Sequence, residues 1–440
     1  MSRSSRRHLA SLPQWLLCCM PFCLGATERV VHADHGDKPT LTLPGAAAEA
    51  GPHVAQIEAL GDNAWLYLGP PQPDPAWGSA RGRSWGTNQP AAPDLRGAFV
   101  FGEGVHAFVK PDGHYMNDLW FYDINGHRWI CLYPGIDTRT LLDQMQDGTL
   151  QVDERGLLAD EQGQPLPPLL IHAYGFLAYD PHQQQLAIVA GQFDNYFTTG
   201  PGGVFAEAYR LYQQQRAGKD LPGLSPFFYD ARQGRWRCTI VQATPRGGEP
   251  YGGSQLVYVH GKRQFFWGGT SGAWFFDLAN GTWVDARPTG TLPTGIDHCA
   301  CYDSRRDRIY YYTNSASAAH ENFFIYDIQQ NCWTRPRTVG SGPAYASSYE
   351  SIFSYDRAND ALVIIRLYAT EREPRRGVYV FDPQTDSWAD PLPLPPQVID
   401  QVGDGNFGFY DPTLNAYFCC FAHDSRDDGT IWVYRYRKRP

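Results

Sequence analysis

The 440-residue sequence predicts an all-β fold in which repeated four-stranded sheets form a closed ring, the β-propeller. Composition is the first indication. With 44 glycines, 34 prolines and 14% aromatic residues, the chain is typical of many short aromatic strands joined by tight turns. Hydrophobic residues (42%) outnumber charged ones (19%), which excludes a disordered chain. The second indication is a pair of internal repeats, which set the number of sheets.

The first repeat is an aromatic strand that ends in aspartate and is followed six positions later by tryptophan. Residues that favour turns, such as Asn125-Gly126 and Asn280-Gly281, lie between the two. The pattern predicts a hairpin of two antiparallel strands. Its five copies run from Asp123 to Trp129, Asp230 to Trp236, Asp277 to Trp283, Asp327 to Trp333 and Asp382 to Trp388.

The second repeat is a Tyr-Asp pair that ends an earlier strand in the same unit and precedes a polar turn and an apolar strand. It occurs at Tyr179-Asp180, Tyr302-Asp303, Tyr355-Asp356 and Tyr410-Asp411. Together the two repeats give four strands per unit, here called A to D in chain order. A four-stranded unit that recurs about every 50 residues predicts a propeller blade.

The repeats predict six blades. Five have complete C–D hairpins, and a sixth begins at Phe407 and ends near Tyr434 without a strand D or its tryptophan. Residues 62–68, which include Trp65, resemble the missing strand. We therefore expect this amino-terminal strand to complete the last blade, because ring closure removes two exposed sheet edges.

Two stretches of the sequence resemble the repeat of a known protein family. Gly268-Gly269 with Trp274 and Trp283, and residues 117–123 with Trp129, resemble the kelch repeat. The resemblance covers roughly residues 60–440 and implies a six-bladed kelch-like β-propeller. It also implies three kinds of activity: ligand binding, cofactor-free sugar epimerisation, and copper-dependent oxidation of the galactose oxidase type. The copper enzymes fit less well, because they have seven blades and require a Tyr–Cys crosslink.

The amino terminus predicts export. Arg3, Arg6 and Arg7 precede an apolar stretch from Leu9 to Leu24, so residues 1–26 have the form of a secretory signal peptide. The mature protein is then expected to be secreted or periplasmic, through either the general or the twin-arginine route. Residues 27–58 lack periodicity and are expected to form a flexible leader before the propeller of residues 59–440. No later segment is apolar enough to predict a membrane span.

The net charge and the motifs limit the classes of ligand that the protein is expected to bind. The net charge is −9, which does not fit a nucleic-acid binder, and no motif predicts a metal site or a cofactor. We expect the partner to be a carbohydrate or a protein. Sugar epimerisation is the alternative function, and whether the protein is an enzyme stays open.

Loop lengths indicate where a ligand would bind. The A–B and C–D turns are short, whereas the B–C loops are long and share one face with the D–A connections. Two insertions, at about 134–168 and 192–225, are expected on that face, and residues 204–215 within the second predict a helix. Long loops on a rigid scaffold commonly carry binding sites.

Residues just before the A strands should surround the channel mouth on that face, with their side chains facing solvent. In blade 1, which has no Tyr-Asp pair, residues 80–88 are expected in the corresponding place. The candidates for acid–base catalysis are His172, His298 and Glu350, and those for ligand binding are Arg81, Arg83, Tyr174, Tyr251 and Asn406. A purely structural role for these polar residues is the competing interpretation.

Overall fold

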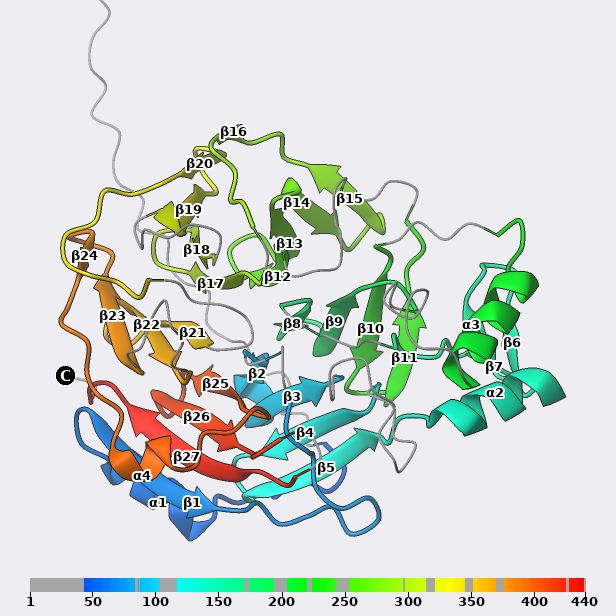
Figure 1. The fold of residues 1–440 in the computed structure, drawn as a ribbon, viewed down its shortest axis with the longest axis horizontal. Coiled ribbons are helices and arrows are strands. Elements are labelled where there is room, and N and C mark those ends of the chain that lie inside the picture. The colour runs from blue at the N-terminus through cyan, green and yellow to red at the C-terminus, as the bar shows by residue number, and fades with distance from the viewer. Residues whose placement is uncertain are drawn as a thin grey trace, which may run out of the picture. The chain divides into compact units, whose positions relative to one another are not determined.

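Six small antiparallel sheets surround a common axis, which confirms the six-bladed propeller (Figure 1). The computed structural model describes residues 43–83, 86, 88–102, 117–169, 173, 175–193, 204–219, 224–241, 245, 253–295, 297–313, 321–344, 351–368, 376–424 and 427–438. These residues belong to one compact unit, Thr40–Pro440.

The first three blades follow the predicted repeats. Blade 1 contains β2 (Ala91–Ala92), β3 (Gly97–Phe101), β4 (Leu119–Asp123) and β5 (Arg128–Tyr133), with the short 3-10 helix η1 (Pro93–Leu95) after β2. Blade 2 contains β8 (Leu177–Asp180), β9 (Gln185–Val189), β10 (Pro226–Asp230) and β11 (Arg235–Cys238). Blade 3 contains β12 (Ser254–Val259), β13 (Gln264–Gly269), β14 (Gly272–Asp277) and β15 (Thr282–Asp285).

The last three blades repeat the order. Blade 4 contains β17 (Cys299–Asp303), β18 (Arg308–Tyr312), β19 (Phe323–Asp327) and β20 (Cys332–Thr334), with β16 (Thr289–Gly290) outside β20. Blade 5 contains β21 (Ser351–Asp356), β22 (Ala361–Arg366), β23 (Gly377–Asp382) and β24 (Ser387–Trp388). Blade 6 contains β25 (Phe407–Asp411), β26 (Ala416–Phe421), β27 (Thr430–Arg435) and β1 (Ala64–Gly69), and the short helix α4 (Pro396–Ile399) precedes it.

The amino-terminal strand closes the ring as predicted. Strand β1 pairs antiparallel with β27, with Trp65 opposite Tyr434 and their ring centroids 4.7 Å apart. The same pairing of the hairpin tryptophan with an aromatic residue of strand C occurs in the other blades, for example Trp129 with Tyr122. Trp65 therefore takes the place of the missing tryptophan of blade 6.

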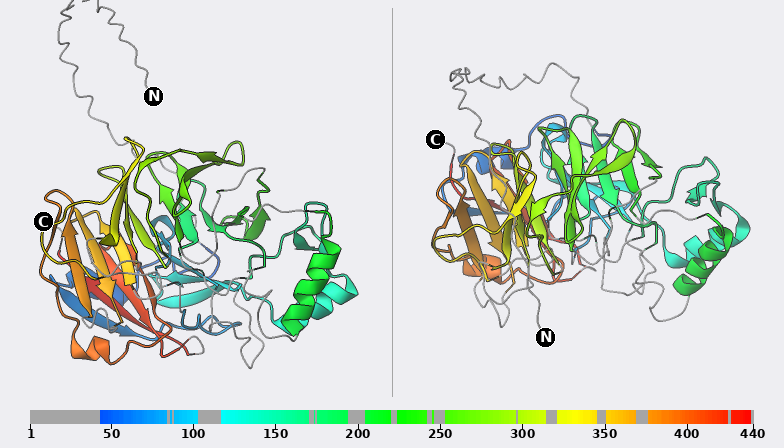
Figure 2. Two further views of the ribbon diagram at one scale, coloured as in Figure 1. Left: turned by 45° about the horizontal axis from the view of Figure 1, so that its top comes forward. Right: turned by 90° about the horizontal axis from the view of Figure 1, so that it is seen from above.

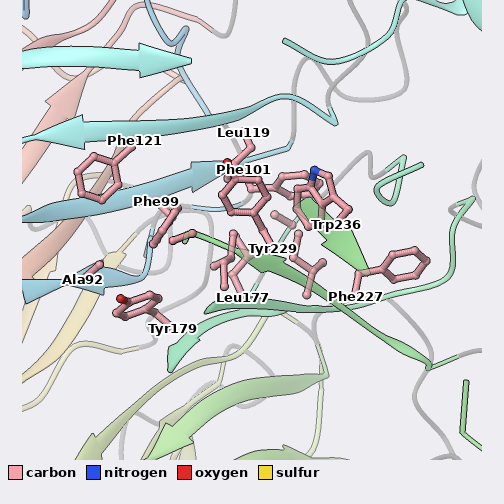
Figure 3. Packing of buried hydrophobic residues seen from close by; sticks show 14 of the residues in the cluster. Ala92, Phe99, Phe101, Leu119, Phe121, Leu177, Tyr179, Phe227, Tyr229 and Trp236 are labelled. Atoms are coloured by element: carbon pink, nitrogen blue, oxygen red, sulfur yellow. The ribbon is translucent and has the colours of Figure 1, made fainter. Parts of the chain in front are cut away.

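Each hairpin tryptophan packs against the preceding blade. Trp129 contacts Phe407 of blade 6 at 6.1 Å between ring centroids, and Trp236 contacts Phe101 of blade 1 at 5.6 Å (Figure 3). The exposed fractions of the five tryptophans are 1% for Trp129, 4% for Trp236, 4% for Trp283, 1% for Trp333 and 7% for Trp388. The repeated tryptophan is therefore the apolar contact between blades, as the repeat predicted.

The aspartates of both repeats cap the turns. Asp123 accepts the backbone N–H of Asn125 (3.1 Å), and Asp180 accepts that of His182 (2.8 Å). Four residues after each aspartate the backbone adopts the left-handed conformation, as at His127 (φ 46°). The aspartate thus satisfies amides that the tight turn leaves without a partner, which explains why it recurs at both hairpins.

Residues 80–88 of blade 1 precede its inner strand, β2, and their described part pairs with blade 6. Asn88 forms a parallel bridge with Gly408, and Arg81 forms an antiparallel bridge with Asp428.

Residues 43–59 correct the prediction of a flexible leader, which is wrong for this part of the chain. Helix α1 (Pro52–Ala59) buries Val54 and Ile57, and Leu43 is also buried. Two apolar side chains one turn apart on a short helix suffice to dock it, although they give too little periodicity to be noticed in the sequence. Residues 27–42 lie outside the described part of the structure.

The two insertions form a common accessory unit. Helix α2 (Thr138–Asp147), strands β6 (Leu150–Val152) and β7 (Leu158–Asp160) and helix α3 (Val204–Gln215) share one apolar core, which includes Leu142, Met145 and Tyr212. The predicted helix at residues 204–215 is confirmed. The two helices lie side by side at the periphery of the ring, near β11 (Figures 1 and 2).

Trp283→Ala tests the contact between blades. The side chain is 4% exposed and its indole N–H donates to the carbonyl of Leu224 in blade 2 (3.1 Å). We expect its truncation to lower the free energy of unfolding by about 3–5 kcal/mol. Trp77→Ala is the matched control, because Trp77 is 57% exposed and should cost less than about 1 kcal/mol. Urea unfolding of both variants measures the difference, and equal losses would contradict the contact.

Two truncations test ring closure. A chain that starts at residue 43 keeps every described contact, whereas a chain that starts at residue 70 loses β1 and leaves the edge of β27 unpaired. We expect the first to remain monomeric and the second to aggregate, since an open strand edge pairs with other chains. Size-exclusion chromatography with light scattering distinguishes them. A monomeric, equally stable second truncation would show that β1 is dispensable.

Candidate functional site

The two ends of the propeller differ in chemistry. At one end, the A–B and C–D turns are short and capped by aspartates. The opposite end, called here the loop face, carries the B–C loops and the D–A connections. Four of the predicted site residues on this face, His172, Tyr174, Tyr251 and Glu350, lie outside the described residues. The other four, Arg81, Arg83, His298 and Asn406, are described.

Arg83 is fully buried in an ion pair. Its guanidinium lies 2.8 Å from a carboxylate oxygen of Asp118, and the same oxygen accepts the indole N–H of Trp120 (2.7 Å). The Arg83 backbone N–H also donates to the carbonyl of Gly405 (2.9 Å). The expectation that Arg83 faces solvent is therefore wrong. The charge is buried because Asp118, at the start of β4, compensates it.

Asn406 lies in the segment that Arg83 contacts. Its side-chain amide N–H donates to the hydroxyl of Tyr368 (3.1 Å), and its carbonyl oxygen accepts the backbone N–H of Gly403 (3.3 Å). Asn406 is only 1% exposed, whereas Arg81 is half-buried. The structure thus brings Arg81, Arg83 and Asn406 together where blade 6 meets blade 1. The two buried members hold the chain in place.

His298 is buried and held neutral. It is 0% exposed, and its imidazole Nε2 lies 3.2 Å from the carbonyl oxygen of Thr294. Burial lowers its pKa to about 4, and the ring meets Tyr311 edge-on at 6.1 Å. The prediction of a solvent-facing histidine is wrong, because the side chain turns into the sheet packing instead of the channel. No described contact joins His298 to Arg83 or Asn406.

Sequence reasoning missed a layer of buried polar residues beneath the loop face. They occupy the last residues of B strands and the residues around the starts of A and C strands. The set is Gln89, Asn117, Asp118, Gln192, Ser225, Ser254, Gln255, Thr313, Asn322, Ser351 and Arg366. In the sequence, each appears only as a polar residue at the end of an apolar strand. Exposed strand ends have the same pattern, so the sequence does not distinguish the two.

Amide side chains of this layer hold the backbone of long connections. Asn117 accepts the N–H of Ile136 (3.0 Å), and Asn322 donates to the carbonyl of Ala344 (2.8 Å). Gln192 bonds both the N–H and the carbonyl of Leu158 in the accessory unit, each at 2.7 Å. The layer therefore fixes the described parts of these connections, at Ile136, Ala344 and Leu158.

The described residues give no metal site. Within the described ranges, no three His, Cys, Asp or Glu side chains come close enough together to hold a metal ion.

Comparisons with known proteins find matches among solved structures only at low sequence identity. No protein-family model matches the chain, and no curated protein matches it. Among solved structures, a structural genomics protein of unknown function from Bacteroides thetaiotaomicron is 10% identical with a TM-score of 0.43, covering 86% of this chain and 73% of its own. TolB from Acinetobacter baumannii is 9% identical with a TM-score of 0.41, covering 79% of this chain and 66% of its own.

Asp118→Asn tests the buried ion pair. The amide keeps the shape of the side chain but leaves the Arg83 charge uncompensated, so we expect a loss of about 3–5 kcal/mol in the free energy of unfolding. Asp153→Asn is the matched control, because the guanidinium of its partner Arg155 is 39% exposed. Such a surface pair contributes about 0–1 kcal/mol. Denaturant unfolding compares the two, and a loss below 1 kcal/mol for Asp118→Asn would show that water reaches Arg83.

Proposed function

We propose that the protein is an exported, kelch-like propeller that binds a carbohydrate or a protein ligand on its loop face. The observation that carries the proposal is the difference between the two ends of the ring. One end is built of short turns whose aspartates are used in capping. The other anchors long connections through buried amide side chains such as Asn117 and Gln192. Rigid support under long loops is the arrangement in which loops bind ligands.

Binding is favoured over catalysis by the state of His298. A general acid or base must reach the proton that it transfers and should have a pKa near the working pH. His298 is inaccessible, and burial lowers its pKa to about 4. This leaves His172 and Glu350 as the remaining candidates for the alternative, a cofactor-free sugar epimerase.

Export is proposed from the amino-terminal sequence alone, with its arginines and the apolar stretch that follows. Among the helices of the described residues, none combines the length and the apolar character that a bilayer crossing requires.

Tyrosine variants test the proposed face. Tyr174 and Tyr251 are the tyrosines that the sequence predicts on the loop face, and each is changed to alanine. Tyr67→Ala is the control, because Tyr67 lies on the outer strand β1 and is 51% exposed. The probe is an array of defined glycans, followed by calorimetric titration with the glycan that binds best. We expect the loop-face variants to bind more than ten-fold more weakly and Tyr67→Ala to bind normally. Equal effects would remove the loop face as the site.

A second arm tests a protein ligand. A photo-crosslinking residue is placed at position 174 or at position 67 in the producing cell. Crosslinking of one defined partner from position 174, and not from 67, supports the protein form of the proposal. An empty array together with no partner specific to position 174 would contradict both forms.

A further inference from the structure

The segment of residues 43–60, called here the strap, docks on the C–D turn of blade 1. The N–H of Ala47 donates to a carboxylate oxygen of Asp123 (2.8 Å), and the side chain of Asn125 donates to the carbonyl of Ala47 (3.2 Å). The N–H of Gly51 donates to the carbonyl of Asn125 (2.9 Å). Three polar contacts with one short turn therefore fix the strap before helix α1 begins.

Two histidines face each other in this contact. His53 of the strap lies with Nε2 2.6 Å from the carbonyl oxygen of Ile124, so Nε2 carries a proton. Its ring centroid is 5.5 Å from that of His127, the left-handed residue of the turn. Nδ1 of His127 lies 2.7 Å from the hydroxyl of Tyr122. With Tyr122 as donor, Nδ1 of His127 accepts, and the imidazole is neutral.

Protonation opposes this arrangement. Burial, followed by the proximity of His53, lowers the pKa of His127 to about 4. A proton on Nδ1 would also remove the acceptor for the Tyr122 hydroxyl and place a positive charge beside the His53 ring.

The other charged groups of the turn are already engaged. Asp123 accepts the amides of Ala47, Asn125 and Gly126, and the Arg128 guanidinium lies 3.9 Å from its carboxylate. Arg96, from the neighbouring turn, donates to Asn125 (3.4 Å). The turn therefore carries two arginines and one carboxylate. It offers little negative charge to stabilise a proton added to either histidine.

We propose that the strap is an acid-released closure of the seam between the first and last blades. In the docked state the pKa of His127 is about 4, and release raises it toward its ordinary value of 6.5, because the burial by the strap and the neighbouring His53 ring are removed. Because the docked pKa is the lower one, docking is fully favourable above pH 6.5 and weakens as the pH falls from 6.5 toward 4. The equilibrium shifts toward release by up to about ten-fold for each pH unit in this window.

Release would uncover apolar surface at the seam. Val54 and Ile57 of the strap belong to the core cluster that joins Trp129 of blade 1 to Phe407 of blade 6. Strand β1 follows the strap and keeps its own pairing with β27, so the ring itself stays closed. Acid is thus expected to expose the seam while the propeller remains folded.

Hydrogen exchange of the full chain measures release. Amide protection in residues 43–56, corrected at each pH for the exchange rate of an unstructured peptide, is followed from pH 7 to pH 4, with β22 as the reference for global unfolding. In the wild type, protection of the strap should fall by up to about ten-fold per pH unit below pH 6.5 while β22 stays protected. A constant strap protection, or loss together with β22, would overturn the proposal.

Histidine variants identify the titrating group. His53→Gln combined with His127→Asn should flatten the pH dependence, since asparagine tolerates the left-handed backbone at position 127. An unchanged slope would refute the histidine pair. If the double variant does not fold, His53→Gln alone should retain more strap protection at pH 4 than the wild type, and equal protection would refute the proposal. The exposed His423, changed to asparagine, is the control and should behave as the wild type.

Discussion

Pairing of the first strand with the last is the constraint on which the rest of this propeller depends. In a ring of blades, each tryptophan of strand D packs on the preceding blade, so a missing strand would leave both a sheet edge and an apolar face open. Trp65 fills that place in blade 6, opposite Tyr434. Arg435 stands where the other blades have the capping aspartate, and its guanidinium donates to the carbonyls of Glu58 (3.1 Å) and Leu414 (2.8 Å). It thereby joins the two ends of the chain directly.

The outer edges of the blades need protection as well. In three blades the preceding D–A connection adds a short parallel bridge outside strand D: Gln72 with Arg128, Thr289 with Cys332, and Val339 with Ser387. The approach is so close that a Cβ on Gly290 would lie 2.0 Å from the carbonyl oxygen of Trp333, where the backbone also has φ +88°. Glycine is required at this position, because a side chain would meet the Trp333 carbonyl and the backbone is left-handed.

The fold could be predicted from sequence because its determinants are local and repeated. An aspartate that caps a turn and a tryptophan six residues later recur at fixed spacing. A copy that departs from the pattern therefore does not hide the repeat. Blade 1 is the exception: its inner strand is only two residues long and carries no Tyr-Asp pair, so neither repeat marks it in the sequence. The docked part of the leader was missed because it contacts a distant turn mainly through its own backbone, at Ala47 and Gly51. Such contacts leave no pattern in the strap itself.

The candidate site was harder to predict for a related reason. Alignment on strand A correctly brings Arg83 and Asn406 to one end of the ring, but it cannot tell whether a polar side chain points into the channel or back into the packing. Arg83, His298 and Asn406 all point inward, since each finds a partner there: Asp118, the Thr294 carbonyl and Tyr368. Asp118 lies 35 positions from Arg83 and Tyr368 lies 38 positions from Asn406, so these partners become visible only when the chain is folded. Arg83, His298 and Asn406 therefore serve the packing beneath the loop face, because a buried partner holds each of them there.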